Sequence, residues 1–365
     1  MASSTFDLPE QIDTPTVVVD IDILERNIIT WARRMDARSV GLRPHTKTSK
    51  CVQIVQRQVN AGVVGLTVAT LGEAESLAAA GFDELFQAYP LWVGHSGRAD
   101  RLRALHERVD FMVGVESVEA AGMLGAATRG SDRRLAVLIE VNSGLDRSGV
   151  EPEESVRIAR AASDAGLEVR GAFTFGGHAY ADPRAAPAAG DDEVIALSKA
   201  AALLSDAGFE PKILSAGSTP TAFHSARPPV TEERPGTYVF NDAQQLALGV
   251  ADLADVALVV AATVVASHPD GRFVLDAGSK AIAADKPPWV NGHGLLPAYP
   301  EAELRSLSEH HCVCWTTGRR PAIGEVVAVI PNHACVVVNL VDSITVVSRG
   351  QMVDRWPIVS RGRNS

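Results

Sequence analysis

The stretch "VVGLTVATLGEAESLAAAG" (63–81) joins a short apolar run to a segment of helical length. Its first seven residues form a near-continuous apolar run, which is typical of a strand buried on both faces of a parallel sheet. The second part is rich in Ala, Leu and Glu, residues with high helix propensity, and it ends at Gly81. This strand-then-helix unit decides the fold, because the chain repeats it on both sides.

Eight such apolar runs, each bounded by Gly, Pro or Asp and separated from the next by a helical segment, lie between residues 14 and 218. They are "TPTVVVD" (14–20), "VGLRPH" (40–45), "VVGLTVA" (63–69), "DELFQAYPL" (83–91), "DFMVGVES" (110–117), "RLAVLIEVNS" (134–143), "EVRGAFTFG" (168–176) and "KILSAGS" (212–218). Eight strands with intervening helices favour a closed (β/α)8 TIM barrel over an open doubly wound sheet. We assign this barrel to residues 14–250.

The alternation of apolar runs with helical segments stops at about residue 255. Strand-like runs such as "VALVVAATVVAS" (256–267) and "SITVVSRGQMV" (343–353) follow one another with almost no helical segment between them. Strands without crossover helices predict an antiparallel sheet. We therefore expect a second, mainly antiparallel β domain, formed by residues 251–365 together with residues 1–13.

Composition excludes several classes of partner. The chain has 34 Lys+Arg against 44 Asp+Glu, a net charge of −10, and no basic stripe suited to nucleic acid. It has no apolar stretch of the length that a membrane helix needs, and its N-terminus lacks a signal-peptide pattern, so we expect a cytoplasmic protein. Four cysteines fit a reducing compartment without a structural disulfide.

Barrel active sites lie at the carboxyl ends of the strands, and polar residues gather there in this sequence. In "SAGSTP" (215–220) a glycine flanked by hydroxyls follows a strand, an arrangement that exposes backbone N–H groups to an anion such as phosphate. The alternative is an ordinary strand-to-helix turn with a hydroxyl cap. The strand-end residues expected to share one pocket are Arg43, His45, Lys47, Tyr89, Asn142, Asp146, Arg147, His178, Tyr180, Ser215, Gly217, Ser218 and Thr219.

Lys47 in "RPHTKTSK" (43–50) allows three interpretations: a solvated residue, a phosphate clamp, or the amine of a Schiff base. A strand-end lysine beside a phosphate site indicates pyridoxal phosphate, with desolvation and cationic neighbours raising the reactivity of the amine. Lys50 serves as the comparison, because we expect it to lie solvated at the start of the next helix.

Eight motifs give the chain a resemblance to a known family. The motifs are "DTPTVVVDIDILERNI", "LRPHTKTSK", "FQAYPLW", "NSGLDRSGV", "LSAGSTPT", "RPGTYVFND", "LDAGSKAIAAD" and "IPNHACVVVNL". In this order and spacing, from about residue 12 to about residue 360, they resemble the metal-dependent D-threonine aldolase and D-serine dehydratase group. These are fold-type III pyridoxal-phosphate enzymes related to the N-terminal domain of alanine racemase.

The resemblance implies roles for individual residues. Lys47 would hold the cofactor as a Schiff base, Arg147 would lie near its ring, and the "HxC" pair His333 and Cys335 would bind a divalent metal such as Zn²⁺ or Mn²⁺. A homodimer is also implied. With the strand-end candidates included, the expected cofactor-binding residues are Lys47, His45, Arg147, Tyr180, Ser215, Gly217, Ser218, Thr219 and Tyr238.

The metal pair also follows from the residues themselves. If "HAC" (333–335) lies in a strand, residues two apart point to the same face and present an imidazole and a thiol together. That donor set suits Zn²⁺ and similar ions. The alternatives are a hydrogen-bonded core histidine at His333, or metal contact by "EHHCVCW" (309–315), which we interpret as a loop leading into a strand.

The resemblance implies a lyase that acts on D-3-hydroxy amino acids. We favour the D-threonine aldolase type, with His178 as the base at the β-hydroxyl, because "FQAYPLW" and "RPGTYVFND" resemble the bacterial aldolases. The alternative is a D-serine or D-3-hydroxyaspartate dehydratase, with Lys47 as the α-proton base, towards which a thiolate ligand leans. Racemisation and a pyridoxal-phosphate carrier are the weaker alternatives, because neither needs the metal pair.

Overall fold

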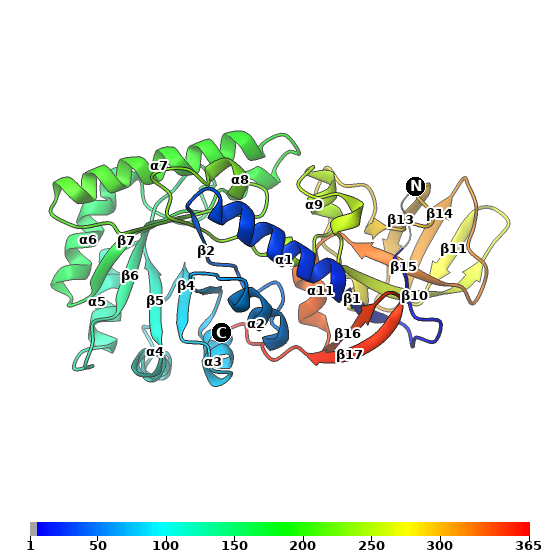
Figure 1. Ribbon diagram of the computed structural model, residues 1–365, viewed down its shortest axis with the longest axis horizontal. Helices are drawn as coiled ribbons and strands as arrows, with labels where there is room; N and C mark the ends of the chain where they lie inside the picture. The colour runs from blue at the N-terminus through cyan, green and yellow to red at the C-terminus, as the bar shows by residue number, and fades with distance from the viewer. Residues whose placement is uncertain (1–5) are drawn as a thin grey trace. The chain divides into compact units, whose positions relative to one another are not determined.

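The computed structural model describes residues 6–365, which divide into two compact units (Figure 1). The first, called the barrel unit, comprises Trp31–Lys47, Gln58–Gly236 and Gly362–Ser365. The second, called the β unit, comprises residues 6–30, Thr48–Arg57 and Thr237–Arg361. Each unit is therefore assembled from segments that lie far apart in the sequence.

The barrel unit is built on eight parallel strands in the order β2-β9-β8-β7-β6-β5-β4-β3. Backbone hydrogen bonds join the two ends of this order: the Val64 N–H donates to the Leu42 oxygen, and the Thr67 N–H to the Pro44 oxygen, each at 2.9 Å. The sheet thus closes into the predicted barrel. Its strands are β2 (Gly41–Leu42), β3 (Leu66–Val68), β4 (Glu84–Pro90), β5 (Asp110–Val115), β6 (Ala136–Glu140), β7 (Glu168–Phe173), β8 (Ile213–Ala216) and β9 (Glu232–Glu233).

Helices follow the barrel strands, and Figure 1 shows α3 to α7 on the outside of β4 to β7. Side-chain caps fix where several of them begin: Thr70 accepts the Glu73 N–H at the start of α3, and Ser117 accepts the Ala120 N–H at the start of α5. The helices up to Ser225 are α1 (Ile21–Asp36), α2 (Val52–Asn60), α3 (Leu71–Ala79), α4 (Ser96–Arg108), α5 (Val118–Ala127), α6 (Ser155–Asp164), α7 (Ala186–Asp206) and α8 (Ala222–Ser225), with 3-10 turns η1 (Pro152–Glu154) and η2 (Gly177–Tyr180). The first parts of α1 and α2 belong to the β unit.

One predicted barrel strand is placed differently. The run at 14–20 forms β1 (Thr16–Asp20), which pairs antiparallel with β10 (Leu258–Ser267) and parallel with β16 (Ser343–Ser348) in the β unit. The prediction was wrong because a fully apolar run fits any sheet that is covered on both faces. The eighth barrel strand is instead β9, two residues long, which the sequence pattern did not reveal.

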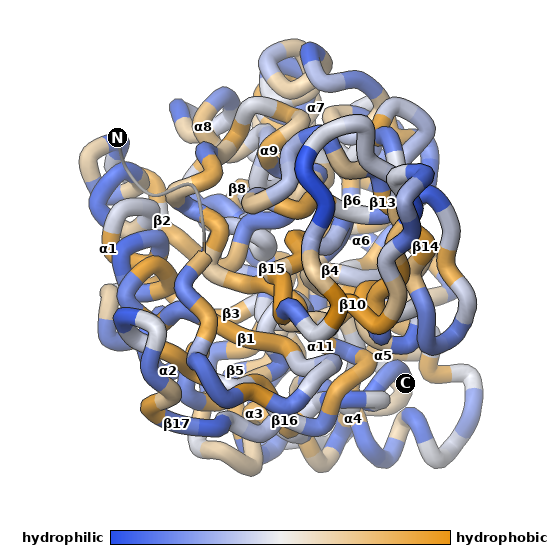
Figure 2. The backbone as a smooth tube through the Cα atoms, turned by 90° about the vertical axis from the view of Figure 1, so that its right-hand side faces the viewer, coloured by the Kyte–Doolittle hydropathy of each residue, from blue (hydrophilic) through white to orange (hydrophobic). Residues whose placement is uncertain are grey.

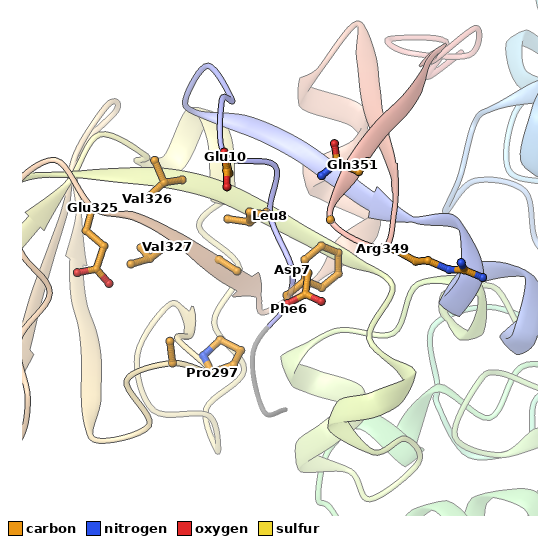
Figure 3. Close-up of a pocket in the computed structure, with 13 residues that line it drawn as sticks. Phe6, Asp7, Leu8, Glu10, Pro297, Glu325, Val326, Val327, Arg349 and Gln351 are labelled. Atoms are coloured by element: carbon orange, nitrogen blue, oxygen red, sulfur yellow. The ribbon is translucent and has the colours of Figure 1, made fainter. Parts of the chain in front are cut away.

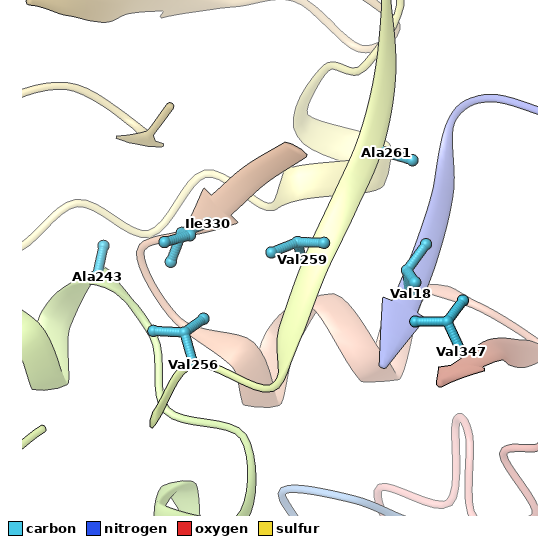
Figure 4. Packing of buried hydrophobic residues seen from close by; sticks show 7 residues of the cluster. All are labelled: Val18, Ala243, Val256, Val259, Ala261, Ile330 and Val347. Carbon is cyan, nitrogen blue, oxygen red and sulfur yellow. The ribbon is translucent and has the colours of Figure 1, made fainter. Parts of the chain in front are cut away.

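The β unit holds a mainly antiparallel sheet of nine strands, as predicted. Val18, Val259 and Val347 pack together in its core, with Ile330 and Val256 beside them (Figure 4). In Figure 2 the backbone is hydrophobic along β1 and β10. The remaining elements are β11 (Arg272–Leu275), β12 (Gly294–Leu295), β13 (Ala302–Leu307), β14 (Cys312–Thr316), β15 (Val326–Pro331), β17 (Gln351–Pro357), α9 (Ala243–Ala247), α10 (Ser279–Ile282), α11 (Ala334–Leu340), η3 (Thr237–Val239) and η4 (Leu253–Asp255).

The β unit also carries a surface hollow of about 450 Å³, shown in Figure 3. Phe6, Leu8 and Val327 give it apolar walls, and Glu10 and Arg349 lie at its margin. None of the predicted site residues lines it. Within residues 6–365, no helix combines the length and the apolar character that crossing a bilayer requires.

Candidate active site

Lys47 lies in the turn after β2, and its side chain is exposed. The Lys47 N–H donates to Nδ1 of His45 at 3.5 Å, and His45 forms a parallel bridge with Thr67 of β3. Burial, followed by the charges of Lys47 and Arg234, holds the pKa of His45 well below its usual value. A neutral imidazole therefore accepts from the backbone of Lys47 at the carboxyl end of the barrel.

The "SAGSTP" segment leaves β8 in a tight loop. Gly217 has φ +92° and donates its N–H to Oε1 of Glu193 at 3.0 Å, while the Ser218 N–H donates to Oγ1 of Thr221 at 2.9 Å. The Thr219 hydroxyl is buried and has no hydrogen-bond partner in the described structure. An unpartnered buried hydroxyl in this loop fits an oxygen of a bound phosphate.

Ser215, also predicted to contact the cofactor, faces the barrel interior. Its hydroxyl donates to Oε1 of Glu232 and accepts from the Arg234 guanidinium, both at 2.6 Å. Glu232 also forms an ion pair with Arg43, whose Nε lies 2.8 Å from Oε2 of Glu232. Both arginines are at most 9% exposed; the ion pair with Glu232 neutralises the charge of Arg43, and the Ser215 hydroxyl satisfies a donor of the Arg234 guanidinium.

The loops after β6 and β7 carry three further candidates. His178 lies in η2 with Nε2 3.2 Å from Oδ2 of Asp192, and its Nδ1 is buried without a partner. An ionised Asp192 favours the tautomer with the proton on Nε2, which leaves the Nδ1 lone pair free to accept a proton. Tyr180 ends the same turn and is half-buried, and the exposed Arg147 stacks 5.1 Å from the ring centre of Phe175.

The "HAC" pair lies in the β unit at the start of a helix. β15 ends at Pro331, and His333 is the N-cap of α11, so the prediction of a strand through both residues was wrong. His333 Nδ1 is 3.2 Å from Oδ2 of Asp242, and the same oxygen accepts the Ala334 N–H at 3.0 Å. The helix turn, rather than a strand face, therefore sets the position of the pair.

Two threonine hydroxyl groups lie near the Cys335 sulfur. Thr48 Oγ1 lies 3.1 Å from the Cys335 sulfur and Thr237 Oγ1 lies 3.9 Å from it. Tyr238, a predicted cofactor contact, follows Thr237 in η3 and is fully buried. Thr48, Thr237 and Cys335 all belong to the β unit.

The chemistry of this pair fits a metal ion. Burial alone would lower the pKa of His333, but the Cys335 charge and hydrogen bonds that the imidazole donates to Asp242 and Cys335 raise it well above its usual value. An imidazole and a cysteine sulfur held near each other are donors from which a metal cation can displace protons. The acceptor on Nδ1 matches the carboxylate that orients many metal-binding histidines.

His333 and Cys335 are the two metal-ligand candidates at this site. In the described part of the chain, His, Cys, Asp and Glu side chains form no cluster of three or more arranged to hold a metal ion. His333 and Cys335 would supply an imidazole and a sulfur ligand to such an ion.

The competing "EHHCVCW" segment forms the start of β14. Cys312 and Cys314 are buried with their sulfurs 3.6 Å apart, whereas His310 and His311 are exposed. The imidazoles and the thiols therefore do not gather at one point.

Lys50 is buried, in contrast to the solvated position expected from the sequence. It is 6% exposed and its Nζ donates to Oδ1 of Asn339 on α11 at 2.8 Å, so it is not the solvated residue that the sequence predicted. A positive φ of 49° turns the chain here and carries the side chain inward. Spacing alone gives no signal of such a turn.

With this geometry described, known proteins can be compared. Residues 19–244 match the profile described as alanine racemase, N-terminal domain, and residues 257–347 match a serine dehydratase domain. The chain belongs to the alanine racemase N-terminal domain family. This membership, with the second domain, confirms the predicted fold-type III pyridoxal-phosphate group and makes the protein an enzyme of the lyase type.

The chain is similar to two curated lyases over nearly its whole length. It is 34% identical to the D-threo-3-hydroxyaspartate dehydratase of Delftia sp. (strain HT23), covering 89% of this chain and 91% of that one. It is 29% identical to the D-threonine aldolase of Arthrobacter sp., covering 96% and 93%. Both relatives are lyases of hydroxy amino acids with the D configuration.

Solved structures within the alanine racemase-like group have the same fold. The Delftia dehydratase superposes with a TM-score of 0.88 at 33% identity, over 95% of this chain and 97% of that one. The D-threonine aldolase from Filomicrobium marinum gives 0.89 at 27%, over 98% and 99%. The structure of a D-threo-3-hydroxyaspartate dehydratase mutant with a cysteine replaced by alanine is of the metal-free form, and it superposes with a TM-score of 0.87 at 32% identity.

Proposed function

We propose that this enzyme is a pyridoxal-phosphate- and metal-dependent dehydratase of D-3-hydroxy amino acids that yields a 2-oxo acid and ammonia. The observation that carries the proposal is the thiol of Cys335, held beside His333 and Thr48 where a metal ligand is expected. The higher identity to a dehydratase than to an aldolase, and the metal-free cysteine mutant of a D-threo-3-hydroxyaspartate dehydratase, support it. The sequence motifs alone favoured the aldolase.

Each of the site residues would have its own role in this reaction. When bound, pyridoxal phosphate withdraws electrons from the α-carbon of the amino acid, and a divalent metal polarises the β-hydroxyl as a Lewis acid. Lys47 would hold the cofactor through its amine and remove the proton at the α-carbon. Thr219 offers its unpartnered hydroxyl to the phosphate, and His333 and Cys335 hold the metal while Asp242 keeps Nδ1 of His333 protonated.

The second candidate is the D-threonine aldolase reaction, and a different observation favours it. His178 is held by Asp192 with its buried Nδ1 unpartnered, as a base at the substrate hydroxyl would require. Removal of the hydroxyl proton breaks the Cα–Cβ bond and releases glycine and an aldehyde. The two reactions differ in which proton leaves first.

Product identification separates the candidates. The purified protein, supplied with pyridoxal phosphate and Zn²⁺ or Mn²⁺, is incubated with D-threonine, D-serine and D-threo-3-hydroxyaspartate. A 2-oxo acid plus ammonia is the expected result, whereas glycine plus an aldehyde would make the aldolase correct. Full activity after chelation of the metal would contradict both and favour racemisation, which would appear as the L-amino acid. The cytoplasmic location and the homodimer stay predictions.

A further inference from the structure

Two carboxyl groups lie buried directly behind the Gly217 loop. Glu193 of α7 and Glu233 of β9 are both fully buried. Oε1 of Glu193 accepts two backbone N–H groups, from Gly176 at 2.7 Å and from Gly217 at 3.0 Å. One carboxyl group therefore ties the loop that carries His178 to the loop that carries Ser218 and Thr219.

Glu233 occupies the space that a side chain at position 217 would need. A Cβ added to Gly217 would lie 1.7 Å from Oε2 of Glu233, and Gly217 has a positive φ, so both the backbone conformation and the contact require glycine. Oε1 of Glu233 accepts the Ser225 hydroxyl at 2.8 Å. The loop is thus held from behind by two acids on two different elements.

The charge state of these acids matters for an anion site. Oε2 of Glu193 and Oε2 of Glu233 are buried without a hydrogen-bond partner, a position in which an ionised oxygen is costly. Burial raises the pKa of both groups, and the charge of Glu193 adds to the increase at Glu233. Burial therefore works against a negative charge on either acid beneath a loop that binds phosphate, and the Glu193 oxygen can accept the two N–H groups in either charge state.

We propose that Glu193 is a positioning residue, which, backed by Glu233, fixes the Gly217–Thr219 loop for the phosphate group of the cofactor and holds the His178 loop to it. The inference rests on the proposed function, since it takes the bound anion to be the phosphate of pyridoxal phosphate. It assigns to an acid on α7, outside the sequence motifs, the task of shaping the anion site.

The first test measures the loops without cofactor. Hydrogen exchange at the Gly176 and Gly217 amides is followed by NMR in the cofactor-free protein. Glu193→Ala should speed exchange at both amides, because their shared acceptor is gone, and Glu193→Gln should leave it nearly unchanged, because its amide oxygen can still accept. Unchanged exchange in Glu193→Ala would overturn the proposal.

The second test separates the phosphate from the rest of the cofactor. Dissociation constants for pyridoxal phosphate and for pyridoxal are measured with wild type, Glu193→Ala, Glu193→Gln and the control Asp191→Asn, an exposed acid on the same helix paired with Arg227. Glu193→Ala should weaken pyridoxal phosphate about tenfold or more while pyridoxal changes less than about threefold. The Gln variant and the control should match wild type.

Each other outcome has a defined meaning. Equal losses for pyridoxal phosphate and pyridoxal would indicate general destabilisation and overturn the proposal, as would a Gln variant as weak as Ala. If Glu193→Ala does not fold, Glu193→Asp, which withdraws the carboxyl by one methylene, should give the same phosphate-specific loss at smaller size; parallel losses would overturn the proposal. A wild type that binds no pyridoxal phosphate would overturn the proposed function, while the exchange test still decides whether Glu193 holds the two loops.

Discussion

Replacing Asp242 by asparagine should damage the metal site more than the fold. The carboxyl group is fully buried and serves three donors: Oδ1 accepts the Gln245 N–H at 2.9 Å, and Oδ2 accepts the Ala334 N–H at 3.0 Å and His333 Nδ1 at 3.2 Å. The carboxylate uses one oxygen for Gln245 and the other for Ala334 and His333, whereas an asparagine side chain has only one oxygen. Whichever way the amide turns, at least one buried donor faces an NH₂ group.

The size of each effect follows from these contacts. One unsatisfied buried N–H costs about 1–3 kcal/mol of unfolding free energy. If the NH₂ faces His333, Nδ1 must accept and the ring proton moves to Nε2, which then cannot bind a metal. Loss of such an orienting partner costs about 10- to 100-fold in metal affinity.

Two measurements check this prediction. Unfolding of the metal-free protein in urea gives the stability change, and titration with Zn²⁺ or Mn²⁺ followed by elemental analysis gives the affinity. The control is Asp270→Asn, an exposed turn residue that accepts the Arg272 N–H at 3.1 Å and should change neither quantity measurably. An Asp242→Asn protein with wild-type metal affinity would show that Asp242 does not orient His333.

Three further changes have defined outcomes. Lys47→Ala should abolish the visible absorbance of bound cofactor and all activity; retained absorbance in the purified variant would remove Lys47 from its assigned role. Cys335→Ala should lose metal by elemental analysis while keeping the cofactor, and unchanged metal content would contradict the pairing with His333. Because burial and then the charge of Glu193 raise the pKa of Glu233, its contribution to stability is complete below the usual carboxyl pKa of 4.5 and is lost as pH rises through the raised value. Glu233→Gln should therefore flatten the fall in unfolding free energy above that pH, and an unchanged slope in urea unfolding would speak against a protonated acid.

The alternation of apolar runs and helical segments predicted seven of the eight barrel strands but not β9. Seven of the expected strands lie in the parallel sheet, because each is an apolar run followed by a helix. β9 escaped notice because its two residues are glutamates, and Glu232 is buried in an ion pair with Arg43, which lies far away in the sequence. Contacts formed only in the folded barrel leave no local pattern to read.

At the site, sequence motifs identified residues better than conformations. "HAC" was assigned a strand, yet the pair sits at the start of α11, where Asp242 holds both the imidazole and the first helical N–H. Lys50 was expected in water, yet a positive φ turns it inward to Asn339. A run such as "VIPNHACVVV" is apolar enough for either a strand or a buried helix, so only the tertiary acceptor decides between them.

β1 links the first part of the β unit to segments made much later on the ribosome. Its valines pair with β10, roughly 240 residues further along the chain, and with β16 beyond that. At about 5–20 residues per second, synthesis of β10 lags β1 by roughly ten to fifty seconds. During this interval Val17, Val18 and Val19 form an unpaired β-prone segment of the kind that invites intermolecular strand pairing. Translation speed and chaperone access, rather than final stability, should therefore govern how much of this enzyme reaches its native state.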